Sequence, residues 1–172
     1  MRGGQSSRIP NAGSNPSSWL WAALLWPLAA AAQPASLLKD IRPASVGDSN
    51  PRDFLSFDSK VYFQADRDTF GSEIWVTDGT PGGTQLFMDI NPGRDFSAPR
   101  HLTDVGSWFA FEATDGENGF QLWASDGTVA GTQRLSDIRQ NQFGTADLND
   151  LTVLDGRLLF AATDGGTSNK LV

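Results

Sequence analysis

Cysteine is absent from this chain of 172 residues, and histidine and tyrosine occur once each, as His101 and Tyr62. Without cysteine the chain forms no disulfide, carries no thiol nucleophile and offers no N-terminal cysteine for lipid attachment. Zinc sites built on pairs of histidines or cysteines are excluded as well. A Ser–His–Asp triad would depend on His101 alone, and we interpret this residue as a surface or strand-edge histidine.

Other common catalytic motifs are also missing. The sequence has no Gly-x-Ser-x-Gly elbow, no phosphate-binding loop and no Gly-x-Gly-x-x-Gly motif. Glycoside hydrolysis by two carboxylates stays open, because acidic residues are plentiful and the separation that this chemistry needs is spatial.

Basic residues are outnumbered, with 13 Lys and Arg against 20 Asp and Glu and a formal net charge of −7. No basic patch is available to neutralise phosphates, so nucleic acid and anionic membranes are poor candidates for partners. Beyond the N-terminal segment, no stretch of about ten residues or more carries a convincing helical stripe. The sequence therefore predicts a β-rich protein.

The N-terminal segment, residues 1–32, has the features of a secretory signal. Arg2 and Arg8 give a positive start, and the apolar run Trp19–Ala32 ends in small side chains. A membrane-spanning helix needs about 20 apolar residues, and this run is shorter and contains Pro27. We predict cleavage before Gln33, no membrane span after cleavage, and a secreted, periplasmic or cell-surface location.

One phrase occurs twice, as Gly71–Ile90 and again, offset by 48, as Gly119–Ile138. An internal repeat of this length indicates a repeat architecture, and residues present in both copies are expected to build the repeat. The predicted structural positions are Trp75, Asp78, Gly79, Thr80, Gly83, Thr84 and Asp89 in the first copy, and Trp123, Asp126, Gly127, Thr128, Gly131, Thr132 and Asp137 in the second.

These copies divide the chain into segments. We assign residues 1–32 to the signal peptide, 33–52 to the final strand of a preceding repeat (Leu37–Ile41) and a linker, 53–99 to repeat 1, 100–148 to repeat 2, and 149–172 to an incomplete repeat 3. The unfinished third copy predicts an N-terminal piece of a longer protein or a truncated product. Further repeats from the same chain or another would then be needed to close a ring.

Each repeat is expected to hold four short strands. Apolar residues alternate with period two in Val61–Ala65, and a second strand is predicted at Glu73–Thr77, a third at Thr84–Ile90 and a short leading strand at Phe54–Phe57. Four antiparallel strands in about 48 residues is the size of one propeller blade. The predicted fold is all-β, with tandem four-stranded antiparallel blades in a partial β-propeller-like array.

The phrase Glu73–Thr80, followed by Gly83-Thr84 and Asp89-Ile90, resembles the bacterial ELWxxDGT repeat. The second copy departs from that repeat at Gln121 and at Arg134-Leu135. The resemblance covers about residues 37–172 and implies a propeller-like β fold in an exported protein. It carries over no catalytic residue.

Two interpretations of the acidic residues stay open. In the first, Asp78-Gly79-Thr80 and its second copy are structural turns, because Asp accepts from backbone N–H groups two residues on and Gly adopts positive φ. In the second, calcium binds to oxygen ligands at alternate positions of Gly-containing loops. The calcium candidates are Asp66, Asp68, Asp115 and Glu117.

For the function we predict a non-catalytic exported repeat protein that presents a binding, adhesion or structural surface to an unidentified protein or glycan. No catalytic residue and no cofactor other than calcium is predicted. The alternatives are the N-terminal fragment of a propeller enzyme that acts on glycans, and a truncated product without independent function. Differences between the copies, such as Glu73 against Gln121, could tune a ligand site or carry no function.

Overall fold

A computed structural model describes residues 35–43, 47–67, 71–93, 95–135, 148–162 and 170–171. The predicted signal peptide, residues 1–32, lies outside the described residues. The chain separates at Ala35 into two units, and the fold below is that of the second, Ser36–Val172. No helix long and apolar enough to cross a membrane occurs in the described part of the chain.

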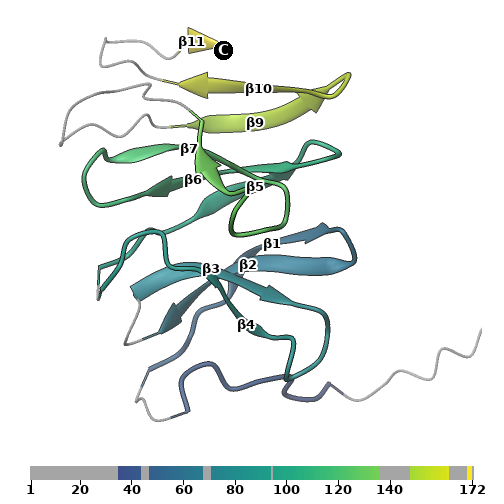
Figure 1. The fold of residues 1–172 in the computed structure, drawn as a ribbon, viewed down its shortest axis with the longest axis vertical. Coiled ribbons are helices and arrows are strands. Elements are labelled where there is room, and N and C mark those ends of the chain that lie inside the picture. Colours follow the sequence, from purple (N-terminus) through teal and green to yellow (C-terminus); the bar gives the residue numbers. More distant parts are fainter. Residues whose placement is uncertain are drawn as a thin grey trace, which may run out of the picture. The chain divides into compact units, whose positions relative to one another are not determined.

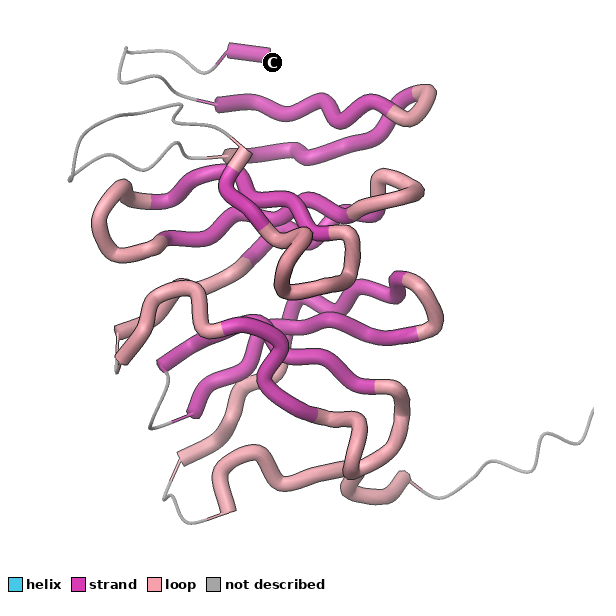
Figure 2. Tube along the Cα trace, in the orientation of Figure 1, coloured by secondary structure: helices cyan, strands magenta, loops and turns pink. Residues whose placement is uncertain are grey.

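The described residues form eleven strands and no helix, which confirms the all-β prediction (Figures 1 and 2). Sheet one has the order β1-β2-β3-β4, sheet two the order β5-β6-β7-β8, and sheet three the order β11-β10-β9. Neighbouring strands are antiparallel throughout. The strands of sheet one are β1 (Arg52–Phe57), β2 (Lys60–Arg67), β3 (Gly71–Thr77) and β4 (Gln85–Met88). Those of sheet two are β5 (Arg100–Asp104), β6 (Phe109–Thr114), β7 (Phe120–Ser125) and β8 (Gln133–Arg134), and those of sheet three are β9 (Asn149–Leu154), β10 (Arg157–Ala162) and β11 (Lys170–Leu171).

Two strand predictions were wrong. The third strand of the repeat ends at Met88, because the N–H of Ile90 donates to the Glu73 carboxylate and not to the ladder. The Leu37–Ile41 segment forms no strand. It is attached to sheet one by side chains instead, since Lys39 Nζ donates to the Thr84 carbonyl and Ile41 packs on the sheet.

Side-chain alternation packs the three sheets face to face. In sheet two, Phe109 and Phe111 point toward sheet one, where they meet Tyr62 and Val76. Ala110 and other side chains of the opposite face pack against sheet three. Each four-stranded sheet thus buries both faces, as the period-two pattern requires. The outer face of sheet one is covered by Ile41.

A β-bulge recurs near the start of the leading strand of each sheet. The bulge residue has a positive φ in each sheet: 54° at Asp53, 58° at His101 and 54° at Asp150. The pairing register shifts at the same places, between Arg52 and Leu55 in sheet one and between Arg100 and Thr103 in sheet two. The lone histidine is therefore a bulge residue at a strand edge, with aspartate at the equivalent positions.

Candidate functional site

The repeated Asp-Gly-Thr phrase builds a turn between two strands. Asp78 Oδ1 accepts hydrogen bonds from the backbone N (2.9 Å) and the Oγ1 (2.7 Å) of Thr80, and Asp126 makes the same two bonds to Thr128 at 2.9 and 2.7 Å. These bonds, first of all that from the Thr80 hydroxyl, hold the pKa of Asp78 below its usual value, and those from Thr128 do the same for Asp126. One oxygen of each carboxylate, Oδ1, is thus the acceptor that closes the turn.

A threonine closes each turn against the sheet. Thr84 Oγ1 lies 2.7 Å from Thr77 Oγ1, and Thr132 Oγ1 lies 2.7 Å from Ser125 Oγ. Gly83 is held close to the Asp78 carboxylate, where a Cβ would lie 2.0 Å from Oδ1. Gly131 has the same relation to Asp126, which explains the glycine before each threonine.

The two repeated tryptophans lie inside the stack. Trp75 is 2% exposed and Trp123 is 8% exposed. Trp75 packs with Phe63, and Trp123 packs in the cluster between sheets one and two. Neither indole is accessible to a ligand in the described part of the chain. The last repeated acid, Asp89, has its pKa raised by burial, and its counterpart Asp137 lies outside the described residues.

Glu73 is the acid with the largest upward shift among the described residues. Its side chain is fully buried and accepts hydrogen bonds from Ile90 N (3.0 Å), Ser97 N (2.9 Å) and Ser97 Oγ (2.5 Å). Burial raises its pKa to about 7, although these hydrogen bonds lower it. The carboxyl faces backbone donors of the loop between β4 and β5, so it anchors this loop.

The calcium candidates do not converge. Asp115 accepts from Glu117 N, from both nitrogens of Asn118 and from Arg134 Nη1 (3.3 Å), which is the pattern of a turn. Asp66 lies at the end of β2, in a different sheet. Asp68 lies outside the described residues. Among the residues that are described, no group of three metal-ligating side chains comes together, and calcium binding stays a prediction.

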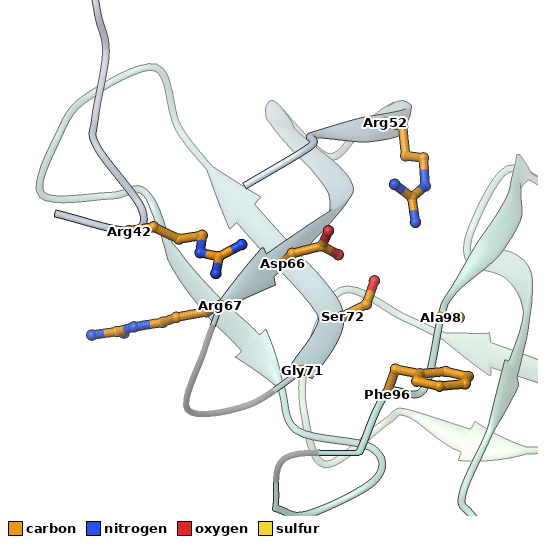
Figure 3. Close-up of a pocket in the computed structure, with 8 residues that line it drawn as sticks. All are labelled: Arg42, Arg52, Asp66, Arg67, Gly71, Ser72, Phe96 and Ala98. Carbon is orange, nitrogen blue, oxygen red and sulfur yellow. The ribbon is translucent and has the colours of Figure 1, made fainter. Parts of the chain in front are cut away.

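One pocket gathers residues that the sequence analysis did not connect. Its volume is about 490 Å³, and it lies where β2 ends and β3 begins (Figure 3). Arg42, Arg52 and Asp66 extend into the region around Ser72, and the Phe96 ring lies on the opposite side of Ser72 from Arg42 (Figure 3). The lining residues are Arg42, Arg52, Asp66, Arg67, Gly71, Ser72, Phe96 and Ala98. Among these described residues, three arginines against one aspartate give the lining a positive formal charge in an acidic chain.

Two anchored segments form the walls of this pocket. On one side, Arg42 Nη1 donates to the Asp48 carbonyl (2.7 Å) and Asp66 N to the Ser49 carbonyl (2.7 Å). On the other side, Ser97 N and Ala98 N both donate to the Ser72 carbonyl, at 3.1 and 3.0 Å. The backbone of both segments is therefore attached to sheet one, through Asp66 of β2 and Ser72 of β3.

Glycine is required at the base of the second wall. Gly71 has φ of +67°, and a Cβ there would lie 2.2 Å from the carbonyl oxygen of Asp95. The loop that carries Phe96 therefore lies directly on the start of β3.

Some of the pocket residues differ between the two copies, whereas Arg52 and Gly71 recur in the second copy as Arg100 and Gly119. A spacing of 48 places Asp115 opposite Arg67, Phe120 opposite Ser72 and Glu112 opposite Gln64. This loss of repetition was the available sequence signal. It was missed because the residues are dispersed between Arg42 and Ala98 and only the sheet brings them together.

Comparisons with known proteins add no relative to this description: no family model, no curated protein and no solved structure matches the chain.

Proposed function

We propose that this chain is a non-catalytic exported repeat protein whose β-sheet stack presents a binding surface for a glycan. The observation that carries this proposal is that the polar residues of the repeats fall into two groups, one that builds turns and one that lines a pocket. Residues common to both copies are engaged in turns, as Asp78 and Asp126 are. Several residues that differ between the copies, such as Asp66, Arg67 and Ser72, line an open pocket with an aromatic wall.

Binding fits the pocket better than catalysis. Hydrolysis of a glycoside by two carboxylates needs two acidic groups across the bond, and among the described residues that line the pocket Asp66 is the one acid. Glu73, whose pKa lies near neutrality, would be the natural candidate for an acid catalyst, yet its side chain is fully buried and bonded to Ile90 and Ser97.

The proposal includes a propeller-like arrangement and export. Face-to-face packing of successive four-stranded antiparallel sheets supports blades of the propeller type, and the resemblance of the repeated phrase to the ELWxxDGT repeat agrees with it. Export rests on the signal-like composition of residues 1–32.

The test uses the full chain expressed in a bacterium with a secretory pathway. We expect the product to accumulate outside the cytoplasm and to begin at Gln33. The exported protein is then incubated with a panel of neutral and acidic oligosaccharides, with binding followed by calorimetry and the sugars examined afterwards by mass spectrometry. Binding with every sugar intact supports the proposal. Cleaved sugars would show an enzyme, and an intact fold that binds none of the panel would contradict the proposed role.

A further inference from the structure

We propose that the pocket at the start of β3 binds the carboxylate of an acidic sugar, a uronic acid unit of a glycan, and that Arg52 and Ser72 are its carboxylate partners. This inference rests on the proposed function and specifies its ligand class.

The comparison of two equivalent arginines supports an anion at Arg52. In sheet two, Arg100 forms a two-pronged ion pair with the buried Glu112, from Nε to Oε2 (2.7 Å) and from Nη2 to Oε1 (3.2 Å). In sheet one, Arg52 Nε donates to Oε1 of the equivalent Gln64 (2.8 Å). The geometry is shared, but Gln64 is neutral. The strand partner therefore compensates the charge of Arg100 and does not compensate that of Arg52.

Gln64 also links Arg52 to Ser72. While its amide oxygen accepts from Arg52, its Nε2 donates to Ser72 Oγ. Because Ser72 Oγ accepts from this amide, its own hydrogen is directed elsewhere and can be donated to a ligand. In Figure 3 the side chains of Arg52 and Ser72 point toward one another. A planar carboxylate accepts well from a guanidinium together with a hydroxyl.

Asp66 and Phe96 select a sugar acid over a simple anion. Asp66 Oδ2 accepts from Asn50 Nδ2 (3.0 Å), while Oδ1 is buried and meets no partner among the described residues. A buried acceptor of this kind calls for a donor, which a sugar hydroxyl supplies and phosphate at neutral pH supplies poorly. The Phe96 side chain is 57% exposed and offers an apolar wall for the C–H face of a sugar ring. A volume of about 490 Å³ suits one or two sugar units.

The experiment measures binding of digalacturonate to the exported product of the full chain by calorimetry, beside digalactoside, its neutral counterpart, as the comparison sugar. We expect digalacturonate to bind at least about tenfold more tightly than the neutral sugar, since charged hydrogen bonds distinguish them. We also expect the affinity to fall as salt is added.

The decisive variant is Gln64→Glu. Glutamate fits at this position, as Glu112 shows in sheet two. Its carboxylate would neutralise Arg52 and accept the hydrogen bond of the Ser72 hydroxyl, so that neither group is left for the ligand. We expect a loss of digalacturonate affinity of about tenfold or more. Arg52→Gln should cause the same loss, and it serves if Gln64→Glu does not fold. The matched control is Glu112→Gln, which makes the reverse exchange outside the pocket and should leave binding unchanged in a protein with a normal melting curve.

The outcomes separate this inference from the proposed function. Equal binding of the neutral and acidic sugars, unchanged in Gln64→Glu, would overturn the uronate site while leaving a glycan-binding protein. Equally tight binding of inorganic phosphate or glycine, lost in Gln64→Glu, would show a general anion or amino acid site and overturn the sugar assignment. Cleaved sugars, or no binding of any glycan, would overturn the proposed function as well.

Discussion

The two repeated tryptophans differ in the contact that the indole nitrogen makes. Trp123 Nε1 donates to the Ala113 carbonyl at 3.0 Å, whereas Trp75 Nε1 is buried and meets no acceptor in the part of the chain that the structure describes. Trp123→Phe should therefore cost about 1 kcal/mol of unfolding free energy through the lost hydrogen bond, in addition to the lost indole volume. Trp75→Phe should cost less. Denaturant unfolding of both variants checks the order, and an equal cost would contradict the assigned contact.

Glu73 gives the protein a pH dependence whose sign follows from its pKa. Burial raises this pKa from 4.5, the ordinary value of a glutamate side chain, to about 7 in the folded protein. The folded state binds the proton more tightly than the unfolded chain, so the contribution to stability is full below pH 4.5 and is lost as the pH rises to about 7. The natural protein should lose unfolding free energy on the order of 3 kcal/mol across that pH window, and Glu73→Gln should remove this loss.

The measurement for Glu73 is urea unfolding at several pH values on both sides of this window. The glutamine variant should show a flatter dependence of unfolding free energy on pH than the natural protein. Gln121 occupies the same position in sheet two, so the exchange is compatible with the fold. Parallel curves for the two proteins would show that the Glu73 carboxyl does not titrate in this range.

At the scale of elements, the Asp-Gly-Thr turn predicts a coupling between Asp78 and Gly83. A Cβ at Gly83 would meet the Asp78 carboxylate at 2.0 Å, so Gly83→Ala must displace this carboxylate from Thr80. We expect a lower melting temperature for Gly83→Ala in the natural protein and a smaller decrease in the Asp78→Ala background. Gly82→Ala is the matched control, because nothing lies within 4 Å of its Cβ position. Equal decreases in both backgrounds would disprove the coupling.

The strands followed from the sequence where the period-two pattern alone determines them. Val61–Ala65 lies within β2 and Glu73–Thr77 within β3, because alternating side chains must serve two buried faces. The ends of the strands could not be predicted from this pattern, because single polar contacts determine them. Glu73 draws the backbone of Ile90 out of the ladder. The bulges at Asp53 and His101 likewise depend on backbone geometry that the side-chain pattern does not encode.

At the scale of the whole molecule, the sequence predicted the turns of the repeat but not the pocket. Alignment of the two copies reveals what they share, and shared residues such as Asp78 and Asp126 build the turns. The pocket depends on an end of sheet one, where the start of β1, the end of β2 and the start of β3 meet. The linking contacts of Gln64 become visible only when these strands are paired.

The stack itself predicts that sheets one and two unfold together. Phe109 of sheet two is fully buried, and its ring centroid lies 5.2 Å from that of Phe57 and 4.7 Å from that of Tyr62, both in sheet one. Phe109→Ala should lower the unfolding free energy by about 3–5 kcal/mol, through the lost contacts and the cavity. Since each sheet depends on the other to bury a face, amide hydrogen exchange should accelerate in β2 and β3 as much as in β6 and β7. Phe96→Ala removes an exposed ring and should leave exchange in all four strands unchanged. Acceleration confined to sheet two would mean that sheet one is stable alone, and the stack would then be an association of independent sheets.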